Sequence, residues 1–248
     1  MNSSRLPGKA MLGIQGRPMA WHIVSRLRRC PRLAEVALAT ANGEAEAPLR
    51  DMAAESGIRC FAGSEADLID RLYRAALEFE ADAIVRITGD CPLVDAEVVG
   101  RLVDAFVEDP LRWDYVSNVR PRTFPHGLDA EVYPTRMLRL LWDEIEDPLS
   151  REWFPVYLWD REERFRTANV AHSIDLSALR WTVDYADDLE FVRAVYRALY
   201  HEGETFWMSE VLSLLEREPE LSSMNSGHDS TAGWLSPTRP DEQNEGPS

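Results

Sequence analysis

The sequence predicts an α/β fold built around a mostly parallel sheet. Short apolar runs alternate along the chain with longer amphipathic runs, an order typical of βαβ units with right-handed crossovers. A parallel strand that is buried on both faces reads as a nearly continuous apolar run, as residues 35–40 (EVALAT) and 83–88 (AIVRIT) do. The length of 248 residues suffices for one large domain of this class.

The first half of the chain shows the clearest alternation of elements. We expect strands at its four short apolar runs, residues 35–40, 58–62, 83–88 and 115–118. We expect helices at its four amphipathic runs, residues 19–29, 45–56, 65–80 and 95–107. In the third of these helices the apolar side chains recur at helical spacing and predict a stripe that faces the core.

The second half of the chain is less regular and ends in a polar segment. Its apolar runs predict strands at residues 130–133, 165–171 and 180–183. Its amphipathic runs predict helices at residues 135–146, 150–161, 187–201 and 207–217. Residues 221–248 are rich in Ser, Asn, Gly, Pro and acids without periodicity, which predicts a disordered tail after a domain of residues 1–220.

The charge balance narrows the classes of partner. The chain has 43 acidic and 27 basic residues and a formal net charge of −16. This balance argues against nonspecific nucleic-acid binding, which needs a basic surface. A small polyanion such as a nucleotide needs only a few local cations, a metal ion and backbone N–H groups. We expect no membrane insertion, because no apolar run approaches the roughly 20 residues that cross a bilayer.

Cysteine and lysine usage give two further expectations. Cys30, Cys60 and Cys91 are an odd number at wide spacing, which fits neither a disulfide framework nor a zinc site. Without the apolar segment of a secretion signal, they predict a cytoplasmic protein. Among the basic residues only Lys9 is a lysine, which makes it a candidate for a local role as a compact point charge.

Residues 2–9 (NSSRLPGK) have the composition of a phosphate-binding loop. Small residues let the backbone approach an anion, and Arg5 and Lys9 supply positive charge just before a helical segment. The segment lacks the spacing of a Walker A loop. A frayed terminus that ends in a Pro-Gly turn is an equally good interpretation of these residues alone.

Acidic residues follow two of the apolar runs. Asp90 comes just after the run 83–88, at the place where open α/β sheets bind ligands and where carboxylates commonly hold Mg²⁺ against phosphates. Asp95 has the position of an N-cap for the next helix. Asp184 also precedes a helix, and the residues alone favour a capping role for it over a chemical one.

The segment 120–131 (RPRTFPHGLDAE) predicts an irregular loop that carries Arg, His and two carboxylates. Such loops bind ligands more often than core segments do, although His126 is equally well an ordinary surface histidine. The chain has no D-x-D motif, which weakens an interpretation as a metal-dependent glycosyltransferase. It also has no G-x-S-x-G or H-E-x-x-H, so serine hydrolase and zincin chemistry have no support.

Taken together, several segments resemble the SpsF-type cytidylyltransferases, within the group of acylneuraminate and Kdo cytidylyltransferases. They follow the family's order over roughly residues 3–200, and they are RLPGK, GSEADLIDR, VRITGDCPLVD, YVSN, GLDAEV, LRWTVD and DDLE. The resemblance implies a Rossmann-like, three-layer nucleotide-diphospho-sugar transferase fold. It implies Mg²⁺-dependent transfer of CMP from CTP to a sugar acid or related acceptor, with release of pyrophosphate, for surface polysaccharides such as those of the spore coat.

The resemblance also implies roles for individual residues. The residues expected to carry catalysis are Arg5, Lys9 and Asp90. The residues expected to bind the nucleotide are Ser3, Ser4, Arg5, Lys9, Asp70, Arg71, Thr88 and Gly89. Asp90 and Asp184 would be the two metal carboxylates, and Arg120, Asp129 and Glu131 would face the acceptor. For Asp184 only the resemblance reverses the capping interpretation.

The start of the chain and its partners leave alternatives open. The family pattern has an apolar strand before the RLPGK motif, whereas this chain starts at Met1-Asn2, so we expect the central first strand to be absent and to leave a gap. A nucleotide-binding or scaffold protein that is catalytically inactive because the strand is missing is therefore one alternative. A glycosyltransferase on a similar fold is another. Relatives are often dimers, so a homodimer is one expectation for the assembly.

Overall fold

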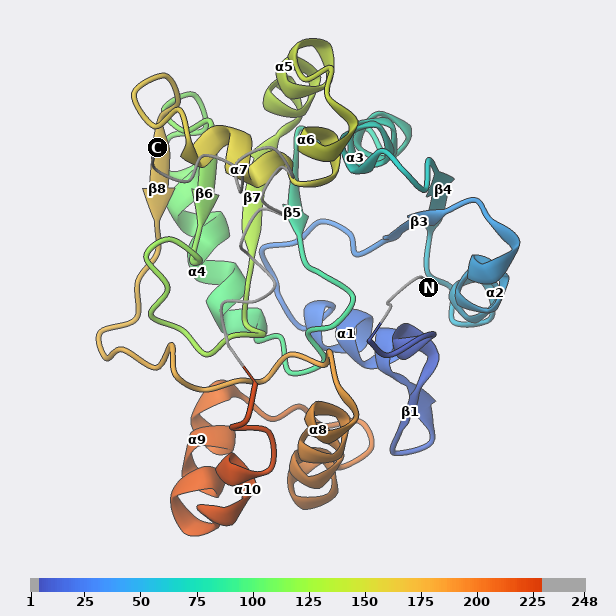
Figure 1. Ribbon diagram of the computed structural model, residues 1–248, viewed down its shortest axis with the longest axis vertical. Coiled ribbons are helices and arrows are strands. Elements are labelled where there is room, and N and C mark those ends of the chain that lie inside the picture. The colour runs from blue at the N-terminus through green and yellow to red at the C-terminus, as the bar shows by residue number, and fades with distance from the viewer. Residues whose placement is uncertain (1–4, 229–248) are drawn as a thin grey trace, which may run out of the picture.

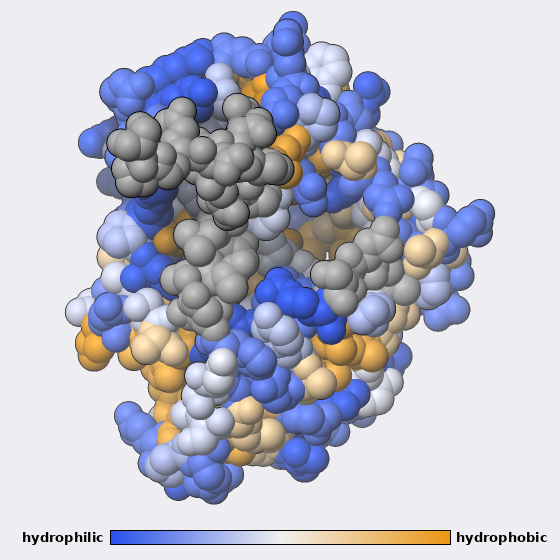
Figure 2. All heavy atoms as spheres, viewed as in Figure 1, coloured by the Kyte–Doolittle hydropathy of each residue, from blue (hydrophilic) through white to orange (hydrophobic). Residues whose placement is uncertain are grey.

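The computed structural model describes residues 5–228 (Figure 1). Ser3, Ser4 and residues 229–248 of the predicted tail lie outside the described residues. Within them, the chain alternates short strands with helices, and the predicted α/β class is confirmed. In the space-filling view of Figure 2, hydrophilic residues dominate the visible face and hydrophobic ones are scattered among them. No helix within residues 5–228 combines the length and the apolar character needed to cross a membrane.

The larger sheet has four strands in the order β5-β7-β6-β8. They are β5 (Ala83–Arg86), β6 (Tyr115–Ser117), β7 (Glu131–Pro134) and β8 (Thr167–Asn169). β6 and β8 are parallel, whereas β7 runs antiparallel to both of its neighbours. The sheet is therefore mixed rather than mostly parallel, because the loop after β6 returns the chain directly alongside that strand instead of crossing over through a helix.

The strands of the first half form separate sheets. β3 (Leu38–Ala41) and β4 (Cys60–Gly63) pair in parallel, and β1 (Gly13–Ile14) and β2 (Arg17–Pro18) form a hairpin. Among residues 5–228, β3 pairs only with β4 and β5 only with β7, and no strand joins the two pairs. The described residues thus form three separate sheets, and no described strand lies between β3 and β5, where we expect the family's first strand to be absent.

Helices cover both faces of the larger sheet. Val116 and Val132 are register partners on β6 and β7, and they share one apolar core with α1, α4, α8 and α9. Their neighbours Tyr115 and Tyr133 face the opposite way, into a second core with α3, α5 and α7. Strand side chains alternate between faces, so this pattern gives the three layers visible in Figure 1.

The helices agree with the predicted runs at most positions. They are η1 (Lys9–Met11), α1 (Met19–Leu27), η2 (Glu44–Glu46), α2 (Ala47–Glu55), α3 (Leu68–Glu78), α4 (Ala96–Val107), α5 (Thr135–Glu144), α6 (Pro148–Glu152), α7 (Phe154–Trp159), α8 (Ala186–Leu199), α9 (Met208–Arg217) and α10 (Glu220–Ser223). The predicted helix over 150–161 is divided into α6 and α7, because Pro155 cannot continue the helical hydrogen bonding from α6. The predicted strand over 180–183 is only an isolated bridge between Arg180 and His126.

The predicted start of the tail at Leu221 is too early. Residues 220–223 form α10, and Asn225 is 3% exposed. Small polar residues in a sequence are typical of a disordered tail. Asn225 is such a residue, but it is buried because its amide donates hydrogen bonds to groups of the folded domain. The folded part therefore includes residues 221–228.

The N-cap predicted at Asp95 is confirmed. Its Oδ1 accepts hydrogen bonds from the backbone N–H groups of Glu97 (2.8 Å) and Val98 (3.2 Å) at the start of α4. Its Oδ2 accepts a third bond from the Met208 N–H at 2.6 Å. One buried carboxylate thus caps α4 and ties α9 to it.

We expect Asp95→Ala to lower the free energy of unfolding by about 2 kcal/mol, because three backbone donors lose their acceptor. Urea denaturation measures this loss. Asp104→Ala is the matched control on the same helix, where an exposed carboxylate pairs with exposed Arg32 and the expected loss is at most about 0.5 kcal/mol. Equal losses in the two variants would contradict the capping role.

Candidate functional site

An ammonium group between two carboxylates forms the centre of the candidate site. Lys9 Nζ lies 2.8 Å from Asp90 Oδ2 and 2.9 Å from Asp184 Oδ1. It also donates a hydrogen bond to the carbonyl of Val183 at 3.0 Å. Three segments far apart in the sequence therefore converge here: the start of η1, the loop after β5 and the loop before α8.

Backbone contacts hold the two acidic loops together. The N–H of Val183 donates to the carbonyl of Asp90 at 2.8 Å, and the Thr182 hydroxyl donates to the same oxygen at 3.3 Å. The Thr88 hydroxyl donates to Asp90 Oδ1 at 2.5 Å, which fixes the orientation of that carboxylate. Gly89 lies between these two residues, and a side chain there would meet no atom within 4 Å.

Lys9 and Asp90 determine each other's ionisation. Burial would lower the pKa of the Lys9 ammonium, but Asp90 and Asp184 outweigh it and raise that pKa above its usual value. Burial would likewise raise the pKa of the Asp90 carboxyl, but Lys9 outweighs it and holds that pKa below its usual value. Lys9 and Asp90 are therefore both charged at neutral pH.

Asp184 is not the helix cap that its position suggests. The carboxylate of Asp188 instead accepts from the backbone N–H groups of Asp184 (2.9 Å) and Tyr185 (3.0 Å) at the start of α8. The Asp184 side chain points to cations: Arg180 Nη2 at 2.9 Å, Lys9, and Arg5 Nη2 at 3.4 Å. The interpretation of Asp184 as a cap is therefore wrong, and its carboxylate is part of the cluster.

Arg5 lies at the open side of the cluster. Its Nη1 donates to the Tyr185 hydroxyl at 3.3 Å, and its guanidinium carbon is 5.2 Å from the centre of the Tyr185 ring. Its side chain is 38% exposed, so the guanidinium can still reach a ligand. The structure thus brings Arg5, Lys9, Thr88, Asp90 and Asp184 together.

The two predicted residues on α3 have other contacts. The Asp70 carboxylate accepts from Arg74 Nε (2.7 Å) and from Trp142 Nε1 of α5 (2.9 Å), so it holds α3 to α5. The Arg71 guanidinium donates to the carbonyl of Ser64 at 2.5 Å, at the end of β4. Arg71 is half-buried, and its Nε has no hydrogen-bond partner. The contacts give Asp70 a role in packing, whereas Arg71 keeps unused donor capacity.

The loop 120–131 shows a buried carboxylate where the sequence suggests an acceptor contact. Glu131 on β7 is 2% exposed, pairs with Arg86 on β5, and accepts from the hydroxyls of Tyr115 (2.7 Å) and Tyr133 (2.8 Å). The expectation that Glu131 faces the acceptor is therefore wrong, because its oxygens are occupied within the core. Sequence reasoning missed Arg86, although a charge inside the apolar run 83–88 is the signal of a buried partner.

The other two residues predicted to face the acceptor differ in burial. Asp129 is buried and pairs with Arg122. Arg120 is at the surface, with its Nε 3.7 Å from an oxygen of exposed Glu162. His126 is buried as well, so it is not the ordinary surface histidine that the sequence allows.

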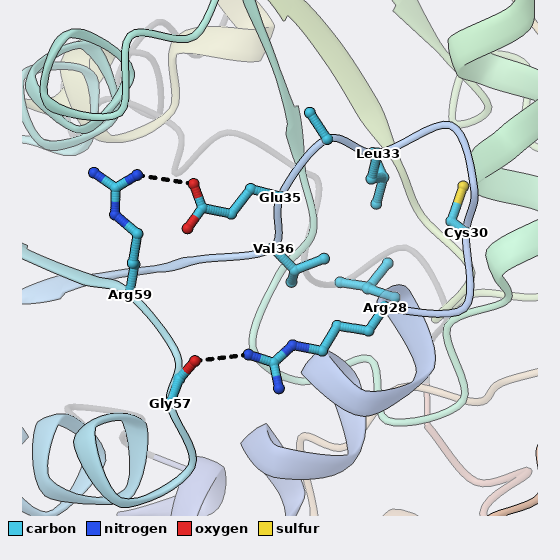
Figure 3. A pocket seen from close by; sticks show the side chains of 9 residues that line it. Arg28, Cys30, Leu33, Glu35, Val36, Gly57 and Arg59 are labelled. Carbon is cyan, nitrogen blue, oxygen red and sulfur yellow. Dashed lines mark hydrogen bonds and ion pairs between the residues drawn. The ribbon is translucent and has the colours of Figure 1, made fainter.

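A cavity of about 270 Å³ lies outside this cluster, between the end of α1 and the start of β3 (Figure 3). Two exposed contacts frame it: Arg59 with Glu35 at 2.9 Å, and Arg28 with the carbonyl of Gly57 at 2.9 Å. None of the predicted site residues lines it. The cavity therefore does not change the assignment of the site.

Comparison with known proteins identifies the family. The cytidylyltransferase family model matches residues 1–143, which include Lys9 and Asp90. The chain belongs to the cytidylyltransferase family. The similarity of this cytidylyltransferase to a solved cytidylyltransferase from Leptospira borgpetersenii extends over the whole fold: 28% identity, a TM-score of 0.86, and coverage of 92% of this chain and 94% of that one.

Two curated relatives give the family context of this cytidylyltransferase. The spore coat polysaccharide biosynthesis protein SpsF of Bacillus subtilis is 25% identical over 90% of this chain and 93% of its own length. The 3-deoxy-manno-octulosonate cytidylyltransferase of Nitratidesulfovibrio vulgaris is 37% identical over 44% of each chain. The predicted resemblance to SpsF-type and Kdo-type cytidylyltransferases is confirmed, as is the nucleotide-diphospho-sugar transferase fold.

We expect Glu131→Gln to lower the free energy of unfolding of this cytidylyltransferase by about 3 kcal/mol, because it leaves the Arg86 charge uncompensated inside the core. Urea denaturation measures this, and the double variant with Arg86→Met should recover most of the loss. A Glu131→Gln protein of unchanged stability would show that the carboxylate is free for an acceptor after all.

Proposed function

We propose that this protein transfers CMP from CTP to a sugar acid or a related acceptor and releases pyrophosphate. The cluster of Lys9, Asp90 and Asp184 carries the proposal, because the two carboxylates and the ammonium meet within 3 Å at the place where open α/β sheets bind ligands. The sugar acid is suggested by the relative named for 3-deoxy-manno-octulosonate. A role in surface polysaccharide synthesis is suggested by the relative named for the spore coat.

The proposed chemistry is an in-line displacement. An acceptor oxygen forms a bond to the α-phosphorus, and the bond from that phosphorus to the bridging oxygen of the β-phosphate breaks. Pyrophosphate leaves with the electron pair, and the proton of the acceptor passes to solvent or to a phosphate oxygen. The protein contributes position and charge, since Arg5 and Lys9 can neutralise the leaving group without a covalent intermediate.

The donor set suits the Mg²⁺ that we include in the proposal. Asp90 and Asp184 offer hard carboxylate oxygens, but residues 5–228 contain no group of three or more side chains that could hold a metal alone. Mg²⁺ commonly takes one or two carboxylates and completes its shell with water and substrate phosphates, which fits two carboxylates beside a triphosphate. When bound, the ion would withdraw charge from the α-phosphate.

The position between the carboxylates is already held by the Lys9 ammonium. One Nζ is within 2.9 Å of both Asp90 and Asp184, so a divalent cation could bind both carboxylates only after the ammonium had moved. A triphosphate offers that ammonium new anionic partners. We include this exchange in the proposal: Lys9 neutralises the carboxylates before the nucleotide arrives and the phosphates afterwards.

The separate sheets favour a second candidate function. β3 and β5 belong to different sheets within the described residues, and an incomplete sheet can leave a nucleotide site without the rigidity that catalysis needs. The chain would then bind a nucleotide and act as a scaffold.

Three free cysteines suit the reducing cytoplasm that we propose for either function.

We expect the protein, given Mg²⁺, CTP and a panel of sugar acids, to release pyrophosphate only when both CTP and an acceptor are present. Asp90→Asn and Asp184→Asn should each lower kcat at least about a hundredfold, because each removes a charge that is positioned at the cluster. Asp175→Asn is the matched control in an exposed loop and should keep full activity.

The outcomes of that assay separate the functions. CTP binding without turnover would favour the scaffold, and consumption of a preformed nucleotide sugar would favour a glycosyltransferase. Full turnover in both cluster variants would contradict the assignment of the two carboxylates.

We expect Lys9→Met to bind Mn²⁺ at least about tenfold more tightly than the wild type when no nucleotide is present, because a nearby positive charge no longer competes. The same variant should bind CTP more weakly. Electron paramagnetic resonance of free Mn²⁺ and calorimetry with CTP measure the two affinities. Lys9→Arg keeps the charge and should keep weak Mn²⁺ binding; tighter binding there, or none in Lys9→Met, would contradict the exchange.

A further inference from the structure

The short segment after α9 packs against the candidate site. α10 contacts α8 and α9, and these three helices lie side by side in Figure 1. Beyond α10, the side chains of Asn225 and His228 reach the start of α8, where Asp184 and Tyr185 lie. Residues 224–228 are here called the C-terminal segment.

Asn225 is the buried anchor of the C-terminal segment. It is 3% exposed, and its Nδ2 donates to the backbone carbonyl of Arg180 at 2.9 Å and to Asp188 Oδ1 at 2.9 Å. A side-chain amide is the fitting group here, because its N–H₂ supplies two donors to two acceptors. Its partners are the residues that hold Asp184.

Asp188 and Arg180 hold the Asp184 carboxylate in place. Asp188 is fully buried and accepts from Arg180 Nε at 2.9 Å and from Arg180 Nη2 at 3.0 Å. The same Arg180 Nη2 donates to Asp184 Oδ2 at 2.9 Å. The backbone N–H of Asp184 also donates to the Asp188 carboxylate. Asp188 therefore orients the backbone of residue 184 directly and its side chain through Arg180.

Arg180, the Asp184 backbone and Asn225 all donate hydrogen bonds to the Asp188 carboxylate. Burial would raise the pKa of the Asp188 carboxyl, but the hydrogen bonds from Arg180, the Asp184 backbone and Asn225 hold that pKa below its usual value. When a buried carboxylate loses one hydrogen-bond donor, its hydrogen bonds to the remaining donors weaken, because the bonds in such a network strengthen each other.

His228 places the C-terminal segment against a second site residue. Its ring stacks on the Tyr185 ring with centres 3.9 Å apart and planes 8° apart, and its Nε2 is 2.7 Å from Asp187 Oδ2. Tyr185 also contacts Arg5 through its hydroxyl and its ring. The segment thus supports Asp184 through Asn225 and neighbours Arg5 through Tyr185.

We infer that the C-terminal segment supports the candidate site and that Asn225 is a positioning residue for Asp184, acting through Asp188 and Arg180. The inference rests on the proposed function, in which Asp184 helps to hold the metal–nucleotide complex. Asn225 touches neither the nucleotide nor the acceptor in this role. It keeps the Asp184 oxygens in the direction that shares a cation with Asp90.

The test is a series of substitutions at position 225 in the full chain. Asn225→Ala should raise the Mg²⁺ concentration for half-maximal pyrophosphate release by about tenfold or more, the usual effect of losing a residue that orients a metal ligand. Asn225→Ser keeps one donor and should lie between Ala and the wild type. Asn225→Asp keeps the shape but places a carboxylate against Asp188, so it should be the most impaired.

The order of these variants separates positioning from packing. If Asn225 only filled space, the Mg²⁺ requirement would be the same across the series even where the melting temperature falls, and that result would overturn the inference. Leu214→Ala on α9 is the control for lost stability, because it removes a buried core side chain. It should lower the melting temperature and leave the Mg²⁺ requirement unchanged; a raised requirement there would also overturn the inference.

A second measurement distinguishes this inference from the proposed function. If the wild type releases no pyrophosphate with any acceptor, the proposed turnover fails, and Mn²⁺ affinity in the presence of CTP is measured for the same series. The order Asn, Ser, Ala, Asp from tightest to weakest supports the positioning role without turnover. Equal Mn²⁺ affinities across the series overturn it.

Discussion

The ammonium of Lys9 is the contact on which the site depends. The backbone hydrogen bond between their loops brings Asp90 and Asp184 together, and without a cation these two partly buried carboxylates would repel each other. Lys9 pairs with both carboxylates. The left-handed conformation of Gly8 (φ 69°) places Lys9 at the start of η1. The single lysine of the chain thus joins the first described loop to the acidic ends of two others.

Two acidic residues near the start of α8 have different roles. A capping residue has to give its carboxylate to backbone N–H groups, and a site residue has to keep its carboxylate free for a ligand. Asp188 takes the first task and Asp184 the second. Asp188 also binds Arg180, which in turn binds Asp184. The residue that caps α8 therefore also sets the geometry of the site.

The sequence predicts the elements well where local rules act alone. The helices and strands of the first half, the cap at Asp95 and the role of Lys9 as a local charge follow from periodicity and composition. Contacts between distant segments are what it cannot supply. The pairing of Arg86 with Glu131 requires the antiparallel register of β5 and β7, and the burial of Asn225 requires acceptors from residues 180 and 188.

The same contacts explain how an acidic protein can bind a triphosphate. Around Asp184 three cations, Arg5, Lys9 and Arg180, face three carboxylates, Asp90, Asp184 and Asp188. The cluster is therefore close to neutral before a ligand arrives, and a triphosphate would add several negative charges to a partly buried place. A divalent cation that arrives with the nucleotide would restore the balance, because it would take over the carboxylates and leave Lys9 and Arg5 to the phosphates. Charge balance at the cluster thus supports a metal–nucleotide complex, rather than the free nucleotide, as the proposed ligand.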